Sequence, residues 1–153
     1  MAKPKATSIV LVMVLVLATV SLIAGTNGYA TYYTPSYLPS ACYGYQDMGT
    51  MIAAASEVFW NGGAACGDRY VVSCTGATNA GVPHPCTGRT VTVQIVDLCT
   101  SPACQGTIDV SQEAFAIIAN PDAGKVQIEY SREGQIEQSI LGPELLIWPR
   151  HFA

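Results

Sequence analysis

TVTVQIVDLCTSPACQGTIDVS, residues 90–111, is the stretch that decides the fold. From Thr90 to Leu98, β-branched residues dominate, and Val91, Val93 and Ile95 place an apolar side chain at every second position, a pattern typical of a strand. The residues that follow form a tight loop with Pro102 and two cysteines. Ser111 has the residue type of a helix N-cap, and an acidic residue follows in the first turn, so we predict that a helix begins there.

Strand signals also flank this stretch on both sides. Gly28–Tyr33, Arg69–Thr75 and Lys125–Tyr130 have the composition and alternation of strands. Met51–Trp60 is apolar and alanine-rich, and it fits either a short helix or a buried extended segment. The 14 glycines and 9 prolines suit a loop-rich β fold. Together these signals predict a small β-barrel or sandwich with one clear helix.

The N-terminus has the pattern of an export signal. Lys3 and Lys5 precede a charge-free run of 16 residues, Ile9–Ala24, and small residues follow. A membrane anchor usually needs about 20 apolar residues, so we predict a leader that is cut after Ala24 or after Gly28. The expected domains are the leader at 1–28, a folded domain at 29–132 and a poorly ordered extension at 133–153.

Six cysteines follow this leader, and an even number in a small exported domain indicates a disulfide framework. The sequence alone leaves their pairing open. A zinc site is the alternative, but His84 and Cys86 are not accompanied by two C-x2-C pairs. We therefore expect no metal, no cofactor and no free thiolate nucleophile. The cysteines are Cys42, Cys66, Cys74, Cys86, Cys99 and Cys104.

The charge of the chain limits its partners. The formal net charge is −4, from 7 basic and 11 acidic side chains, and removal of the leader takes two lysines away. A nucleic-acid binder needs a basic surface, so we exclude nucleic acid. Strong electrostatic binding to an anionic wall polymer such as pectin is also not expected. We expect a monomer.

Six short motifs occur in this order along the chain: Ala30–Tyr33, Ala41–Gly44, Ala65–Tyr70, Cys86–Val91, Val96–Cys99 and Ile108–Ser111. With them, the sequence resembles the small single-domain relatives of expansins, which carry a family-45 endoglucanase-like domain and include plant natriuretic peptides and blight-associated proteins. The resemblance implies a mainly β fold, a six-stranded double-psi β-barrel with short helices, and secretion to the apoplast. It also implies the disulfides Cys42–Cys66, Cys74–Cys86 and Cys99–Cys104.

Glycoside hydrolysis normally needs two carboxylates, and the candidates are Asp97 and Asp109. Both also have a structural interpretation, since Asp97 could bind amides of the following loop and Asp109 could help to cap the helix. The resemblance implies that Asp109 matches the general acid of the related endoglucanases. Their base position corresponds to Pro35, which cannot move a proton, and the expansin histidine two residues before the aspartate is Thr107. We therefore expect no hydrolase, and a lytic activity of one Asp alone is the remaining enzymatic alternative.

What remains is a groove that we expect to include Thr31, Tyr33, Asp97 and Asp109. Aromatic and polar side chains of this kind suit weak binding of a cell-wall glycan. Tyr32 and Tyr33 point in opposite directions on a strand, so one of the two belongs to the core.

The natriuretic relatives imply a different function, which is extracellular signalling through a plasma-membrane receptor. The corresponding segment here includes Trp60, Gly63, Gly67, Arg69 and Tyr70, and an exposed Trp and Arg are typical of a receptor epitope. The alternative is that Phe59 and Trp60 fill the core. Our first interpretation is a non-catalytic apoplastic protein in water and solute homeostasis or stress signalling, and the second is a wall-binding or wall-loosening module.

Overall fold

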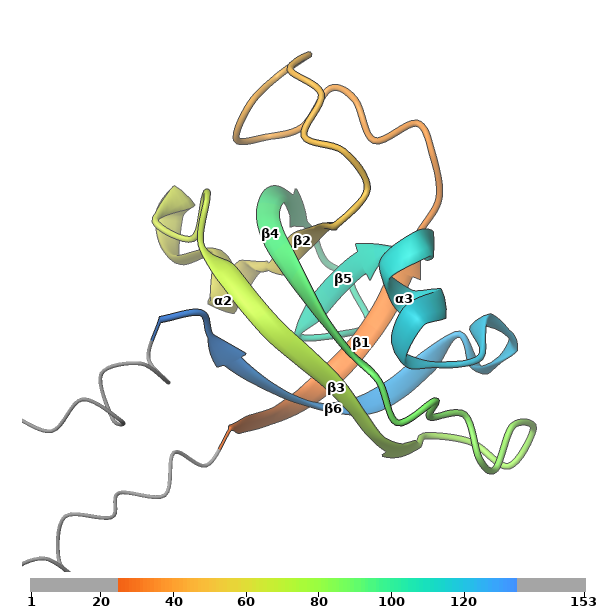
Figure 1. Ribbon diagram of the computed structural model, residues 1–153. Helices are drawn as coiled ribbons and strands as arrows, with labels where there is room; N and C mark the ends of the chain where they lie inside the picture. The colour runs from red at the N-terminus through yellow and green to blue at the C-terminus, as the bar shows by residue number, and fades with distance from the viewer. Residues whose placement is uncertain (1–24, 135–153) are drawn as a thin grey trace, which may run out of the picture. The chain divides into compact units, whose positions relative to one another are not determined.

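The computed structural model describes residues 25–134, which form six strands and short helices (Figure 1). The predicted leader at 1–24 and most of the predicted extension, 135–153, lie outside the described residues. Among residues 25–134, no helix is long and apolar enough to cross a membrane. The elements are β1 (Thr26–Tyr33), β2 (Ile52–Ser56), α2 (Glu57–Trp60), the 3-10 turn η1 (Asn61–Gly63), β3 (Arg69–Ala77), β4 (Thr90–Cys99), β5 (Ile108–Ser111), α3 (Gln112–Ile118), η2 (Pro121–Ala123) and β6 (Lys125–Arg132).

The six strands close into a barrel in the order β1-β5-β2-β4-β3-β6. Two neighbouring pairs, β1 with β5 and β2 with β4, are parallel, while the other four pairs are antiparallel. Closure leaves no free sheet edge, so the described strands have no exposed ladder to pair with another chain. The expected six-stranded double-psi β-barrel is confirmed.

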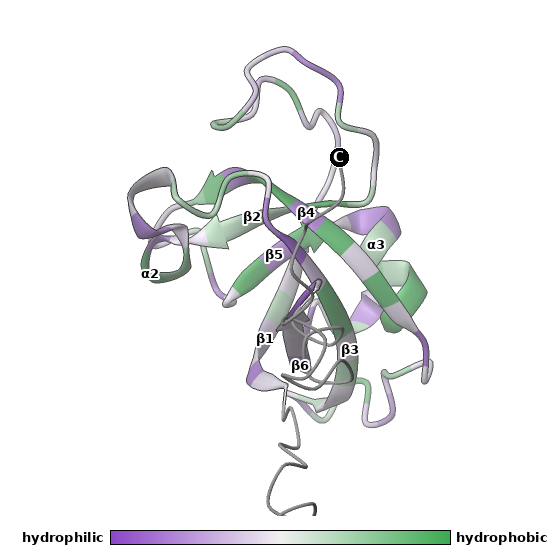
Figure 2. Cartoon of the chain, turned by 60° about the vertical axis from the view of Figure 1, so that its left-hand side comes forward, coloured by the Kyte–Doolittle hydropathy of each residue, from purple (hydrophilic) through white to green (hydrophobic). Residues whose placement is uncertain are grey.

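The alternation of side chains along the strands builds the core. Apolar and polar residues alternate along the first half of β4 (Figure 2), where the side chains of Val91, Val93 and Ile95 are buried. On β6, Val126 and Ile128 point inward, as their spacing predicted. One face of β4 and of β6 therefore fills the barrel and the other face is left for the surface, whereas four consecutive residues of β2 are buried.

Helix α3 covers one side of the barrel and begins where the sequence predicted (Figure 1). The Ser111 hydroxyl accepts a hydrogen bond from the Ala114 amide at 3.1 Å, and it donates to the Thr50 carbonyl. Phe115 is fully buried, and its ring centroid lies 4.9 Å from that of Tyr32. Tyr32 is therefore the member of the tyrosine pair that packs on the core.

Three expectations about the elements need correction or completion. Ile108–Ser111 forms β5, a strand that the alternation pattern did not reveal, because four residues are too few to establish a period. Met51–Trp60 contains both proposed structures, a buried strand from Ile52 followed by the single turn α2. β1 begins at Thr26, three residues before the expected start of the domain at Tyr29.

The three disulfides are those that the resemblance implied, Cys42–Cys66, Cys74–Cys86 and Cys99–Cys104. All six cysteines are thereby paired, which removes them as metal ligands or nucleophiles. The first disulfide ties the loop that follows β1 to the segment before β3, over a sequence separation of 24 residues. The last ties the end of β4 to the loop that leads into β5.

Candidate functional site

The parallel pair β1 and β5 positions most of the predicted groove residues. Thr31 lies opposite Asp109 in the register of the two strands. Because Ala30, Ile108 and Val110 point into the core, Thr31 and Asp109 point to the outside of the barrel. The Thr31 hydroxyl donates a hydrogen bond to Asp109 Oδ1 at 2.7 Å.

Asp109 lies in a half-buried position. Burial raises the pKa of its carboxyl above the ordinary value, and the hydrogen bond from Thr31 opposes that rise. Its second oxygen, Oδ2, lies 3.8 Å from the sulfur of Cys99 in the Cys99–Cys104 disulfide. The structural role predicted for Asp109, a contribution to the cap of α3, is not found, since Ser111 makes the cap with its own hydroxyl.

Asp97 comes from β4 and holds the loop between β1 and β2. Its Oδ1 accepts hydrogen bonds from the backbone amides of Ala41 and Leu98, both at 2.9 Å. The structural interpretation of Asp97 placed its partners in the Cys99–Cys104 loop, but the tethered amide of Ala41 belongs to a different loop. Asp97 therefore connects the loop that arches away from the barrel in Figure 1 to the strand beside the site.

Tyr33 lies close enough to these two carboxylates to feel their charge. Burial, followed by the negative charges of Asp97 and Asp109, raises the pKa of its phenol well above the ordinary value. Among the described side chains, the Tyr33 hydroxyl is buried and has no hydrogen-bond partner. Thr31, Tyr33, Asp97 and Asp109, which we call the Asp–Tyr cluster, thus come together as predicted.

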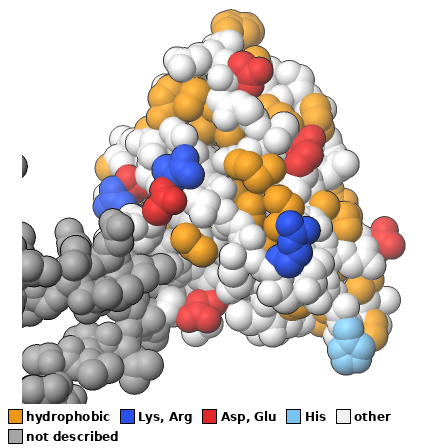
Figure 3. Space-filling view, in the orientation of Figure 1, with side chains coloured by type: hydrophobic (Ala, Val, Ile, Leu, Met, Phe, Trp, Pro, Cys, Tyr) orange, Lys and Arg blue, Asp and Glu red, His pale blue; other side chains and the backbone are white. Residues whose placement is uncertain are grey.

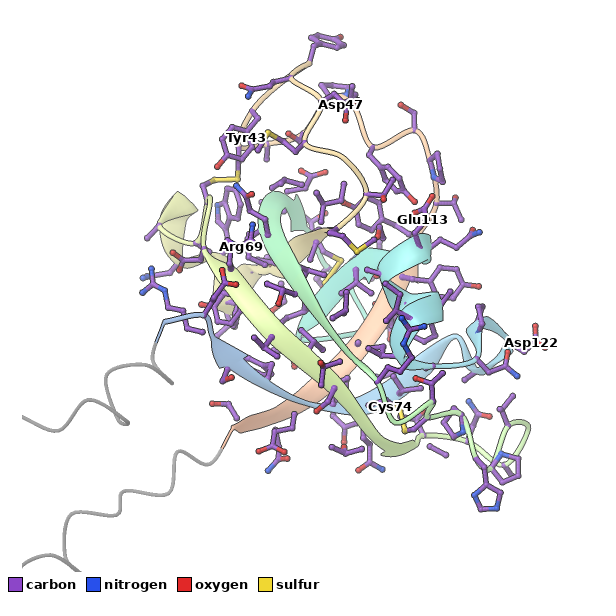
Figure 4. The ribbon with its side chains drawn as sticks, in the orientation of Figure 1. Tyr43, Asp47, Arg69, Cys74, Glu113 and Asp122 are labelled. Carbon is purple, nitrogen blue, oxygen red and sulfur yellow. A yellow bond between two sulfur atoms is a disulfide. The ribbon has the colours of Figure 1, made fainter. Side chains whose placement is uncertain are left out.

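Two further residues, which were not predicted from the sequence, border the cluster. The Tyr37 ring packs edge-on against Tyr33 with 5.1 Å between centroids, and its hydroxyl donates to Glu113 Oε2 at 2.6 Å. Burial and this hydrogen bond raise the pKa of Tyr37 to about 12. Figure 4 shows Glu113 at the start of α3, on the side where the loop leaves β1. Glu113 adds a third carboxylate near Tyr33, so the cluster favours hydroxyl donors over anions.

Pro35 and Thr107, the two departures from the catalytic pattern, lie at opposite ends of this region. Pro35 is exposed just after β1 and offers no titratable group. Thr107 stands two residues before Asp109, and its hydroxyl accepts a hydrogen bond from the Tyr29 amide at 3.2 Å.

The segment predicted for signalling lies on another part of the barrel. Arg69, labelled in Figure 4 away from Glu113, is half exposed and forms an ion pair with Glu133. Trp60 and Tyr70 are partly buried and pack against the core, in line with the structural alternative. Gly63 and Gly67 adopt positive φ angles of 95° and 85°, which explains the glycines at these turns.

The surface carries few charges. On the face in Figure 3, acidic and basic side chains are scattered among apolar and uncharged ones, and two basic groups sit next to acidic ones. No continuous basic strip crosses this face, which agrees with the excess of acidic over basic residues.

The family relation follows from sequence similarity. The chain matches the family described as lytic transglycolase over residues 52–130. An EG45-like domain containing protein from Citrus jambhiri is 61% identical over 107 residues, which cover 70% of this chain and 81% of the relative. A putative EG45-like domain containing protein 1 from Arabidopsis thaliana is 54% identical over 105 residues, which cover 69% and 81%. This chain belongs to the EG45-like domain containing proteins.

The fold of this EG45-like domain is similar to that of solved expansin structures. The apo expansin of Clavibacter michiganensis superposes with a TM-score of 0.54 at 26% identity, covering 72% of this chain and 50% of the expansin. An aspartate-to-asparagine mutant of that expansin in complex with cellohexaose superposes with a TM-score of 0.51, also at 26% identity, covering 70% and 49%. The chain thus spans about half the length of the bacterial expansin, and the predicted expansin-like fold is confirmed.

Proposed function

We propose that this chain is a secreted, non-hydrolytic protein of the apoplast that binds a cell-wall glycan at its Asp–Tyr cluster. The observation that carries the proposal is the convergence of two carboxylates and two hydroxyl side chains on one outer region of the barrel. Sugar hydroxyls donate well to carboxylates such as those of the cluster. The similarity to an expansin solved with cellohexaose supports the same ligand class.

The proposed lack of hydrolysis rests on the roles that the two aspartates already have. Asp109, with its raised pKa, has the environment of a general acid. Asp97 accepts hydrogen bonds from two backbone amides, which gives it a structural role, and Pro35 stands at the position that the family resemblance assigns to the base. Both features argue against the pair of catalytic carboxylates that hydrolysis needs.

Co-sedimentation with insoluble cellulose and xylan tests this function, with reducing sugar measured in the same tubes. We expect the secreted protein to leave the supernatant without releasing sugar. Asp109→Asn removes a charged acceptor from the cluster and should weaken binding by about tenfold. Asp122→Asn is the matched control, because Asp122 lies in η2 beyond the far end of α3 (Figure 4) and undergoes the same change.

Two outcomes would contradict the proposal in different ways. Reducing sugar that is released by the wild type and lost in Asp109→Ala would establish a lytic or hydrolytic enzyme with one essential Asp. Failure of the folded protein to bind any insoluble wall polysaccharide would refute glycan binding at the cluster.

A second function, signalling in water and solute homeostasis, is favoured by the surface around α2. Val58 is 95% exposed at the single turn before the predicted epitope, and the Cys42–Cys66 disulfide anchors this segment at Cys66. An exposed apolar side chain and the half-exposed Arg69 in the same stretch of chain are features of a protein-binding surface. The test is the volume of wall-free protoplasts after addition of the purified protein. A concentration-dependent change would place a target at the plasma membrane, and no change would remove this second function.

A further inference from the structure

A pocket of about 510 Å³ borders Tyr29, four residues before Tyr33 on β1. It opens between β1, the loop before β5, helix α2 and β6. Its lining combines aromatic rings with neutral polar groups, and none of the described residues that line it carries a charge. The principal lining residues are Tyr29, Ser56, Phe59, Gln105, Thr107 and Tyr130.

Glycines allow the strands and loop to approach each other at the base of this pocket. A Cβ on Gly106 would lie 2.9 Å from the Tyr29 carbonyl oxygen, and one on Gly28 would lie 2.7 Å from the Thr107 hydroxyl and 3.1 Å from the Tyr130 ring. Real Cβ atoms do not make such contacts with backbone, so a larger residue at Gly106 would force the loop away. The absence of side chains at these positions therefore shapes the pocket.

The aromatic rings of the pocket are held in place by other residues. Phe59 packs against Tyr70 and Tyr130, with ring centroids 5.0 and 5.6 Å apart. Tyr29 is 47% exposed, and the ammonium of Lys125 lies over its ring, 4.7 Å from the centroid. Such fixed rings bind a flat ligand without a large loss of side-chain entropy.

We propose that this pocket is a second carbohydrate subsite that binds neutral pyranose units of the same glycan, an inference that rests on the proposed function. A pyranose has apolar C–H faces that suit aromatic rings, and its hydroxyls suit Ser56, Gln105 and Thr107. The lining itself offers an anionic ligand no charged group, and the Lys125 ammonium, which is not among the lining groups, is occupied with the Tyr29 ring, so a neutral sugar fits better than an acidic sugar or a phosphate. The volume falls within the range of natural ligand pockets, roughly 300–1,000 Å³.

The position of the pocket connects it to the Asp–Tyr cluster. Tyr29 precedes Thr31 by two residues on β1, so both side chains lie on the same outer face of that strand. In the same way, Thr107 precedes Asp109 by two residues on the chain that enters β5. Two residues of a strand span about 7 Å. A glycan chain that occupies the cluster therefore needs to extend by only one or two sugar units to reach Tyr29.

The test is a map of backbone amide shifts in the NMR spectrum of the secreted, oxidised protein during titration with cellohexaose. We expect shifts at residues 56–59 and 104–107 as well as at Thr31 and Asp109. Xylohexaose, another neutral pyranose chain, should shift the same amides, and oligogalacturonate, which is anionic, should shift neither group.

Variants of Tyr29 separate stacking from folding. Tyr29→Ala should weaken cellohexaose binding by about tenfold because it removes the exposed ring. Tyr29→Phe keeps the ring and should bind like the wild type. Tyr45→Ala is the matched control, since Tyr45 is 81% exposed and is not among the residues that line the pocket.

The outcomes separate a failure of the second subsite from a failure of the proposed glycan binding. Shifts confined to the cluster, with Tyr29→Ala unchanged in affinity, would refute the second subsite and leave glycan binding intact. The absence of shifts with every oligosaccharide would refute both. Shifts at the pocket alone would support the subsite and move the glycan site away from Asp109. Equal binding of oligogalacturonate at the pocket would overturn the assignment to neutral sugars.

Discussion

Replacement of Thr31 by valine isolates the hydrogen bond that the structure places at the centre of the Asp–Tyr cluster. The substitution keeps the β-branched shape that suits β1 and removes only the hydroxyl that donates to Asp109 Oδ1 at 2.7 Å. A hydrogen bond to a charged group contributes about 1.5–3 kcal/mol net. Because this bond is only part-buried, water replaces some of what is lost, so we expect a loss of about 1.5 kcal/mol at neutral pH.

The pH dependence of that loss has a definite sign. Burial raises the pKa of Asp109 in the folded state, so the folded protein retains a proton that the unfolded chain has released. Between the two pKa values stability therefore falls as the pH rises. The Thr31 hydroxyl reduces this cost by favouring the carboxylate. Without it the folded pKa rises further, and the extra loss of stability grows as Asp109 ionises.

Urea denaturation of the oxidised protein at about pH 7 and about pH 3 measures the effect, since the lower value is below the ordinary Asp pKa. We expect Thr31→Val to lose about 1.5 kcal/mol at the higher pH and about 0.5 kcal/mol at the lower, where only a neutral hydrogen bond is lost. Thr31→Ser, which keeps the hydroxyl, should show no such difference between the two pH values. An equal loss at both pH values would refute the argument, because the bond would then be insensitive to the charge on Asp109.

Three further outcomes test the surroundings of the site. Asp97→Ala should accelerate hydrogen exchange of the Ala41 amide by about tenfold, because that amide loses its acceptor; an unchanged rate would show that Asp97 does not hold the loop. Ser111→Ala should lower the free energy of unfolding by about 1–2 kcal/mol, because Ser111 is the buried N-cap of α3; a loss below about 0.5 kcal/mol in urea denaturation would show that the cap is dispensable. Protein that cells expressing the full chain release into the medium should have the mass expected for cleavage after Ala24, because cleavage after Gly28 would remove residues of β1 that pair with β6; a released product that begins at Tyr29 would contradict this.

The sequence predicts local features of this fold well and non-local ones poorly. The strand from Thr90 and the helix start at Ser111 follow from period and residue type within a few positions, and both are found. The strand Ile108–Ser111 owes its existence to partners far away in the chain, since it pairs with Ala30–Tyr33 in parallel and with β2 on its other side. No window along the sequence contains that information, and the double-psi topology became predictable only through the family resemblance.

The same division holds for the candidate site. Thr31, Tyr33, Asp97 and Asp109 were predicted from motifs, and the structure brings them together. The contact between Asp97 and the Ala41 amide joins positions 56 residues apart. The bond from Tyr37 to Glu113 joins positions 76 apart, through a loop whose path has no sequence signal. Acceptors, donors and pKa directions at the site therefore had to come from the structure.

The two proposed binding regions share the outer face of one strand, β1. Tyr29, Thr31 and Tyr33 occupy alternate positions of the strand, while Ala30 and Tyr32 pack toward the core between them. A slip of one residue in the pairing with β5 would bury Thr31 and Tyr33 and expose Tyr32. The hydrophobic core therefore fixes the register of the surface residues. It follows that substitutions at Ala30 should disturb glycan binding without touching the ligand, whereas substitutions at Tyr29 should disturb binding and leave the barrel intact.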